Sequence, residues 1–231
     1  MIDIVVVASK PWTLAYVGQF QKSNPTIQTH VLTEDKDIDF DTLNKINPKF
    51  VFFPHCSWYI PEKIYDNYTC IVFHPTDLPF GRGGTPIQNL IEKGFTKTSI
   101  TAFRVTKEID AGDIFIKRDL SLHGGGEEIM LRMQEIIFRE MIPEIVSSSI
   151  EPMPQIGEPI MFQRRTPEMS EIKPDMSKEQ IFDFIRMLDI DSYPKAFMRF
   201  GNYKLTFSRP ALRSNGIEAS VTISKDANND L

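Results

Sequence analysis

The chain has 231 residues, of which 41% are hydrophobic and 25% are charged, and its formal net charge is −5. A chain of this length and composition can bury a large core, which excludes disorder as its main state. Because broad binding to nucleic acid or anionic membranes depends on clustered Lys and Arg, the acidic balance predicts neither partner, although a small anionic ligand held by local basic residues is still allowed.

The two cysteines, Cys56 and Cys70, form no CxxC motif and no cluster with zinc spacing. The sequence therefore predicts no disulfide framework and no metal site. The N-terminal apolar run is short, contains an acidic residue and follows no basic segment, which favours a buried strand over a signal peptide. Since no stretch approaches ~20 apolar residues, we expect a cytoplasmic protein without a membrane span.

The first half of the chain alternates apolar runs with segments of helical spacing. Continuous runs of β-branched and aromatic residues are typical of strands covered on both faces, so the alternation predicts an α/β fold with a mostly parallel sheet. The predicted strands are 2–8, 29–32, 50–53, 70–73, 99–106 and 114–122. The predicted helices are 13–22, 41–45, 86–93 and the long amphipathic segment 127–147.

The rest of the chain has a different pattern. Residues 151–174 are rich in Pro, Met and charge and show weak periodicity, which predicts a linker between a catalytic domain of residues 1–150 and a small α+β unit of residues 175–231. The expected elements of that unit are a helix at 178–188, strands at 196–200, 204–208 and 218–223, and a frayed tail at 224–231.

The densest functional signal is the segment HPTDLPFGRGGTP, residues 74–86. A buried strand delivers His74 to its carboxyl end, where open α/β sheets bind ligands, and a Gly-rich loop then leads into a helix. A second segment, DAGDI, begins at Asp110 after another strand. Read alone, each residue has a structural alternative: a hydrogen-bonded His at the edge of the core, and a turn-forming Asp.

Together, residues 74–94 (HPTDLPFGRGGTPIQNLIEKG) and 98–115 (TSITAFRVTKEIDAGDIF) resemble the core of the folate-dependent formyltransferases. The segments SWYIPEKIY (57–65), QRRTPEMSEI (163–172) and SYPKAFMRFGNYKLTF (192–207) are similar to further parts of that family. The resemblance implies a Rossmann-like formyltransferase fold with a short C-terminal β-rich appendage. It also implies transfer of a formyl group from N10-formyltetrahydrofolate to an amine.

The resemblance assigns roles to individual residues. It implies that His74 is the general base and that Asp110 orients it. The residues expected to lie along the folate donor are Tyr59, Ile60, Phe103, Val105 and Asp110. The residues expected to contact the acceptor are Lys10, Trp12, Arg82, Gly83 and Gly84.

One position departs from the family pattern. The family's Asn two residues before the catalytic His is Val72 here, and valine cannot donate a hydrogen bond to a developing oxyanion. Losing one such donor costs on the order of 3 kcal/mol. His55 and Thr76 are candidate substitutes. Two alternatives therefore stay open: a catalytically impaired protein that binds folate or a nucleotide-sugar, and a hydrolase that releases formate.

The choice of acceptor within the family rests on size and charge. The short C-terminal region and the net charge of −5 favour a nucleotide-linked amino dideoxy sugar over methionyl-tRNA, and residues 160–210 argue against the shorter enzymes that act on glycinamide ribonucleotide. We therefore expect a sugar N-formyltransferase of lipopolysaccharide or O-antigen biosynthesis. A homodimer is implied by the family alone.

Overall fold

The structure is a computed structural model, and it describes residues 1–8, 10–55, 58–191 and 193–226. The chain packs into two compact units, each assembled from three separate stretches of sequence. Unit 1 consists of Met1–Gly83, Thr98–Leu120 and Leu131–Met161, and unit 2 consists of Gly84–Lys97, Ser121–Met130 and Phe162–Leu231. The division of the chain into a domain, a linker and an appendage stays a prediction.

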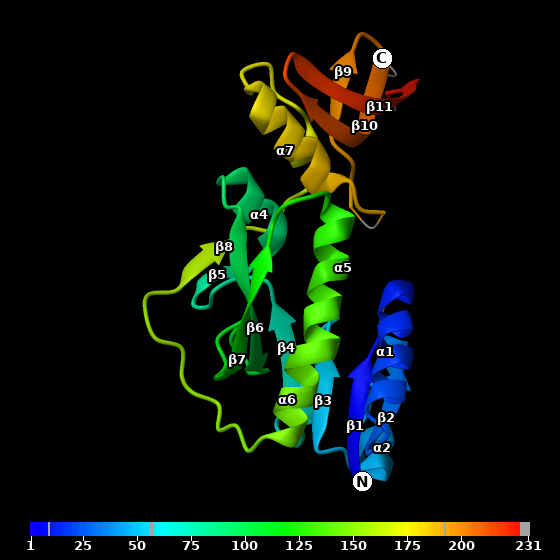
Figure 1. Ribbon diagram of the computed structural model, residues 1–231, viewed down its shortest axis with the longest axis vertical. Helices are drawn as coiled ribbons and strands as arrows, with labels where there is room; N and C mark the ends of the chain where they lie inside the picture. Colours follow the sequence, from blue (N-terminus) through cyan, green and yellow to red (C-terminus); the bar gives the residue numbers. More distant parts are fainter. Residues whose placement is uncertain (9, 56–57, 192, 227–231) are drawn as a thin grey trace. The chain divides into compact units, whose positions relative to one another are not determined.

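The core of unit 1 is a six-stranded sheet with the strand order β2-β1-β3-β4-β6-β7 (Figure 1). The first four strands in this order run parallel, and β6 runs antiparallel to β4. The strands are β1 (Ile2–Val7), β2 (Ile27–Leu32), β3 (Phe50–Phe53), β4 (Cys70–His74), β6 (Lys97–Arg104) and β7 (Ile114–Ser121). The expected α/β fold with a mostly parallel sheet is confirmed.

Helices cover both faces of this sheet, which explains why its strands are continuously apolar. On one face, Leu43 of α2 (Phe40–Ile46) and Ile64 of α3 (Glu62–Tyr65) join a buried cluster with Val51. Alternate strand residues point the opposite way. There, the Phe20 ring of α1 (Pro11–Ser23) meets the Phe138 ring of the helix that follows β7.

The predicted single helix 127–147 is divided into three parts. It consists of α5 (Gly126–Ile136), the π-helical segment η2 (Ile137–Met141) and α6 (Ile142–Ser147). Pro143 has no N–H to donate to the carbonyl of Arg139, and the wider π-helical turn lies where that bond is missing.

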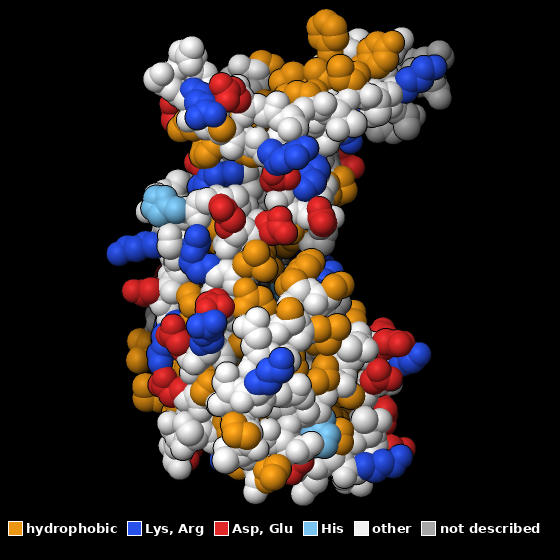
Figure 2. Space-filling model, turned by 45° about the vertical axis from the view of Figure 1, so that its right-hand side comes forward, with side chains coloured by type: hydrophobic (Ala, Val, Ile, Leu, Met, Phe, Trp, Pro, Cys, Tyr) orange, Lys and Arg blue, Asp and Glu red, His pale blue; other side chains and the backbone are white. Residues whose placement is uncertain are grey.

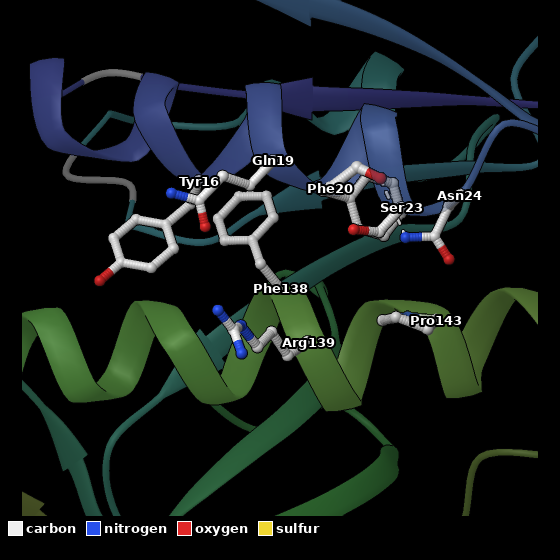
Figure 3. Close-up of a pocket in the computed structure, with 8 residues that line it drawn as sticks. All are labelled: Tyr16, Gln19, Phe20, Ser23, Asn24, Phe138, Arg139 and Pro143. Atoms are coloured by element: carbon white, nitrogen blue, oxygen red, sulfur yellow. Dashed lines mark hydrogen bonds between the residues drawn. The ribbon is translucent and has the colours of Figure 1, made fainter.

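A hollow of about 420 Å³ lies between α1 and this broken helix. Figure 3 shows the rings of Phe20 and Phe138 with polar side chains around them. The polar and charged lining residues are Tyr16, Gln19, Ser23, Asn24 and Arg139. The hollow runs along α1 as far as Asn24, the residue after the end of this helix. Because α1 begins at the carboxyl edge of the sheet, the hollow extends away from that edge.

Unit 2 contains α4 (Pro86–Glu92), α7 (Lys178–Leu188) and an antiparallel sheet of order β11-β10-β9. Its strands are β9 (Phe197–Phe200), β10 (Tyr203–Arg213) and β11 (Gly216–Lys225), so β10 and β11 form a longer hairpin than the sequence predicted. Arg186 of α7 is buried, and its Nη1 donates to the carbonyls of Leu122 and Gly124 at 2.7 and 2.8 Å. The expected C-terminal β-rich unit is confirmed.

Apolar side chains are exposed on this C-terminal sheet, where Figure 2 shows hydrophobic atoms gathered at the top of the view. The exposed large side chains of the sheet are Phe200, Tyr203, Leu212, Val221 and Ile223. Residues 227–231 of the predicted tail lie outside the described residues.

Four short elements complete the described chain: η1 (Asp35–Asp37), β5 (Phe80–Gly83), β8 (Ile160–Phe162) and η3 (Pro167–Ser170). β5 and β8 pair with each other, so the predicted linker contains a strand and the Gly-rich loop contains another. Among the helices that the structure describes, none is long and apolar enough to cross a membrane.

Candidate active site

His74 is the last residue of β4, at the carboxyl edge of the sheet, and only 9% of its surface is exposed. Its Nε2 lies 2.8 Å from the carbonyl oxygen of Gly81. Since a carbonyl oxygen can only accept, Nε2 carries a hydrogen, and Nδ1 is the nitrogen that can hold a lone pair. The Gly-rich loop thus fixes both the orientation and the tautomer of His74.

Asp110 lies beside the other nitrogen of this ring. Its Oδ2 is 3.6 Å from His74 Nδ1 and accepts a hydrogen bond from the backbone N–H of Gly83 at 2.8 Å. Asp110 has a φ of 52°, a left-handed conformation that costs a non-glycine residue about 1 kcal/mol. The structure therefore brings together the two residues that the sequence paired across 36 positions.

The turn that carries Asp110 packs directly on β6. A Cβ atom on Gly112 would lie 1.8 Å from the carbonyl oxygen of Arg104, so this position accepts only glycine. On the other side of the site, Gly81 and Gly83 have φ values of 76° and 105°, which favour glycine. Both backbone segments around His74 thus depend on residues without a side chain.

Three of the residues predicted to contact the acceptor substrate have partners or close neighbours within the protein. Arg82 donates from Nε and Nη2 to Oε1 of Gln155 at 3.1 and 2.7 Å, and the N–H of Gly83 donates to Asp110. In unit 2, a Cβ atom on Gly84 would lie 2.6 Å from Cβ of Arg164, which gives this glycine a packing role. Their contacts with a substrate stay predictions.

A cavity of about 300 Å³ adjoins Asp110. It brings together all five residues predicted to lie along the donor: Tyr59, Ile60, Phe103, Val105 and Asp110. Val72, at the position of the family's Asn, also lines it. Phe103 is buried and Tyr59 is 83% exposed, so the cavity has an apolar wall and an open rim.

The N-terminus of α1 lies near a second histidine. Lys10 is the residue before the first turn of α1, and its Nζ is 6.0 Å from the centre of the Trp12 ring. That ring makes an edge contact with the ring of His55, with 6.2 Å between the centres. The indole Nε1 of Trp12 is buried and has no hydrogen-bond partner among the described residues.

His55 follows β3 at a chain position that corresponds to that of His74 on the neighbouring strand β4. Phe53 of β3 pairs with Val72 of β4 in parallel register, and each histidine follows two residues later. Burial, and to a smaller extent the positive charge of Lys10, lowers the pKa of His55 to about 4. His55 is therefore neutral at pH 7 and carries one N–H.

The two candidate replacements for the family's Asn differ in the structure. Thr76 is fully buried, and its hydroxyl donates to the carbonyl of Gly81 at 3.4 Å. His55 is half-buried at the carboxyl edge of the sheet. Both residues stay predicted replacements for the donor that Val72 cannot supply.

Sequence reasoning missed Gln155. Its Nε2 donates to the carbonyls of Asp110 and Gly112 at 2.8 and 2.9 Å, while its Oε1 accepts from Arg82. Gln155 stands in the predicted linker, where no periodicity or motif marks it. In the part of the chain that the structure describes, no cluster of three or more His, Cys, Asp or Glu side chains could hold a metal ion.

A His and Asp pair at the carboxyl edge of a largely parallel sheet, beside a small-molecule cavity, defines an α/β enzyme site. The sequence pattern described as "Formyl transferase" matches residues 4–133, and the pattern described as "Methionyl-tRNA formyltransferase, C-terminal domain" matches residues 167–224. The chain belongs to the formyltransferase family, and the expected enzyme class is confirmed.

Individual relatives carry a more specific name. The chain is 30% identical over 185 residues to a methionyl-tRNA formyltransferase of Sulfurihydrogenibium sp. (strain YO3AOP1), covering 76% of this chain and 58% of that protein. It thus spans less than two thirds of the length of that relative. A solved structure of methionyl-tRNA formyltransferase from Clostridium thermocellum is 47% identical, with a TM-score of 0.95, and the match covers 98% of this chain and all of that one.

The expected sugar acceptor, and with it the role in polysaccharide biosynthesis, is wrong. A sugar N-formyltransferase from Shewanella sp. is only 14% identical, with a TM-score of 0.70 over 92% of this chain and 99% of that chain, so it shows a common fold alone. The close relatives are methionyl-tRNA formyltransferases, which also contradicts the expectation that nucleic acid is not a partner.

Both errors have a physical reason. Net charge is a sum over the whole chain and does not describe any one surface. Residues 160–225 carry eleven Lys and Arg against eight Asp and Glu, whereas residues 1–159 carry 15 against 21. The short C-terminal region was also a poor criterion, because the C. thermocellum protein is matched over its whole length.

Proposed function

We propose that this chain formylates the α-amino group of methionyl-tRNA, with N10-formyltetrahydrofolate as the formyl donor. The observation that carries the proposal is the His74–Asp110 pair beside a cavity, in a chain that is 47% identical over 98% of its length to a methionyl-tRNA formyltransferase. The resemblance of the sequence to folate-dependent enzymes supports the same donor.

The cavity beside Asp110 suits the ring end of a folate. Its volume of about 300 Å³ is at the lower end of small-molecule sites, enough for a flat bicyclic ring but not for the whole donor. Val72, Phe103 and Val105 offer apolar contacts to such a ring. The backbone from 106 to 110 also lines the cavity and offers polar groups for the ring edge.

When bound, the donor supplies the formyl group as an electrophilic carbon. A bond then forms between the amine nitrogen and this carbon, the bond from the carbon to N10 breaks, and the proton lost by the amine replaces the formyl group on N10. His74 accepts the amine proton at Nδ1, the nitrogen that Gly81 does not hold. Asp110, 3.6 Å away, stabilises the charged ring that results.

The acceptor end of the tRNA fits the N-terminus of α1. Lys10 provides a positive charge there, and this helix has no acidic residue in its first turn, which favours a phosphate. The Trp12 indole N–H is a buried donor without a partner among the described residues, whereas buried donors are normally paired. We assign Lys10 and Trp12 to the terminal nucleotide of the acceptor. The cytoplasmic location stays a prediction.

The test follows both products. Purified protein is mixed with N10-formyltetrahydrofolate and methionyl-tRNA, tetrahydrofolate is measured by absorbance, and formyl-methionine is released from the tRNA and quantified. The two products are expected in equal amounts. His74→Gln should lower the rate at least ~100-fold. His30→Gln is the matched control, because His30 lies on β2 and pairs with Asp3 instead.

The reference reaction replaces the tRNA with a nucleotide-linked amino sugar, from which no product is expected. Binding of the donor without formation of formyl-methionine in the wild-type protein would refute the proposed function. Equal rates for His74→Gln and His30→Gln would refute the assignment of the site.

A further inference from the structure

The segment between α6 and β8 is a long loop (Figure 1), and its residue Gln155 bonds to Asp110 and Arg82 of the candidate active site. We call residues 151–161 the strap. At one end, Met153 forms two backbone hydrogen bonds with Ile114, the first residue of β7, at 2.7 and 2.9 Å. At the other end, the N–H of Ile160 donates to the carbonyl of Pro79 at 3.2 Å. The strap is therefore anchored on both sides of Gln155.

Gln155 uses its whole amide group in this position. An amide side chain has two N–H groups and one oxygen with two lone pairs. Both N–H groups donate, to the carbonyls of Asp110 and Gly112, and the oxygen accepts from two nitrogens of Arg82. Because carbonyls only accept and a guanidinium only donates, the orientation of the amide is fixed by its partners.

The two groups that Gln155 joins belong to the two segments that surround His74. Asp110 is on the turn after β6, and Arg82 is in the Gly-rich loop, next to Gly83, whose N–H donates to Asp110. Asp110 holds a left-handed backbone with a φ of 52°, so its carboxylate stays in place only while the turn is held. Gln155 holds that turn by donating hydrogen bonds to two of its backbone carbonyls.

We propose that Gln155 is a positioning residue, which holds the Asp110 carboxylate against the Gly83 N–H and beside His74 Nδ1. It acts through Asp110 and needs no contact with either substrate. Its effect on rate rests on the proposed function. Its effect on the position of Asp110 does not depend on that function, so the proposed function and the positioning role can be refuted separately.

The direct test is hydrogen exchange of the Gly83 amide, followed by NMR without any substrate. This N–H is protected by the carboxylate of Asp110, so its exchange reports where that carboxylate lies. Gln155→Ala is expected to speed the exchange about tenfold. Gln155→Glu keeps an acceptor for Arg82 but cannot donate to the two carbonyls, and the same acceleration is expected.

Ile156→Ala is the matched control, because this neighbouring side chain is 90% exposed. Exchange at Gly83 should equal that of the wild-type protein in this variant. Unchanged exchange in both Gln155 variants would overturn the proposal. Gln155→Glu serves as the second variant if Gln155→Ala does not fold.

The kinetic test uses the background in which Asp110 is removed. Gln155→Ala alone is expected to lower kcat for formyl transfer between about 10- and 100-fold, since small misplacements of a reacting group have effects of this size. In the Asp110→Ala background, the same substitution is expected to change kcat less than about twofold. An equal loss in both backgrounds would assign Gln155 a merely structural role. If the wild-type protein transfers no formyl group, the proposed function is refuted, and hydrogen exchange at Gly83 alone then tests the positioning role of Gln155.

Discussion

Restoring the family's Asn is expected to rescue a variant that lacks His55. Val72 lines the cavity two residues before His74 on β4, so the two side chains lie on the same face of the strand. Val72 cannot donate a hydrogen bond, and neutral His55, two residues beyond the end of β3, carries an N–H. If His55 is the oxyanion donor, the amide of Val72→Asn and the ring of His55 have the same role.

The magnitudes follow from the loss of one donor, which lowers kcat about 100- to 1,000-fold. His55→Phe keeps an aromatic ring against Trp12 but removes the N–H, so kcat should fall by that amount. Val72→Asn alone should change kcat less than about threefold, because the donor is already present. The double variant should recover at least about tenfold over His55→Phe.

Tetrahydrofolate formation with methionyl-tRNA gives the four rates, and thermal unfolding at pH 7 shows whether each variant is folded. Val72→Asn replaces a half-buried apolar group by a polar one and is expected to cost about 1 to 2 kcal/mol of stability. A full rate in His55→Phe, or no recovery in the double variant, would refute the assignment of His55 as the compensating donor.

Three further predictions concern stability. The pKa of His55 is about 4 in the folded chain, against about 6.5 unfolded, so the unfolded state binds more protons at low pH. The free energy of unfolding should therefore decrease by up to about 3 kcal/mol as the pH falls from 6.5 to 4. In His55→Gln the unfolding temperature should depend less on pH over this range, and an equally steep dependence would contradict the burial of the ring. Gly112→Ala should lower the free energy of unfolding by more than about 2 kcal/mol in denaturant titrations. Gly18→Ala is the control: an added Cβ in this helix would have no atom within 4 Å, so the substitution should raise the free energy of unfolding by about 0.5 to 1 kcal/mol. Equal effects of the two substitutions would mean that the turn at Gly112 can relax. Arg186→Met should lower the free energy of unfolding by about 3 kcal/mol, because the buried carbonyl of Leu122 and the partly buried carbonyl of Gly124 lose their donor. Arg139→Met, which breaks a surface ion pair with Glu135, should cost less than about 0.5 kcal/mol, and a small loss at Arg186 would indicate that water replaces its side chain.

The sheet could be predicted from the sequence because its physical cause is local. Phe50–Phe53 is apolar at every position, and a strand covered on both faces requires this. The bounds of this strand agree with the prediction, and α7 was also predicted with its observed bounds. β5 was missed because its sequence, FGRG, has the composition of a loop and is extended only through its pairing with β8.

The candidate site could be predicted only in part. The meeting of His74 with Asp110 followed from two segments whose spacing resembles a family, and the structure brings them together. Gln155 could not be found, since its partners are 43 to 73 positions away and no local pattern depends on them. The acceptor was predicted wrongly because total charge was used where the charge of one region matters.

The hydrogen bond between His74 Nε2 and Gly81 limits how protons move in this site. A histidine that exchanges protons at both nitrogens can relay them across its ring, taking one in on one side and releasing another on the opposite side. Here the Nε2 hydrogen is committed to a backbone carbonyl, so a proton accepted at Nδ1 must leave from Nδ1. In the proposed transfer, each turnover therefore begins and ends on the same side of the ring, the side that faces Asp110.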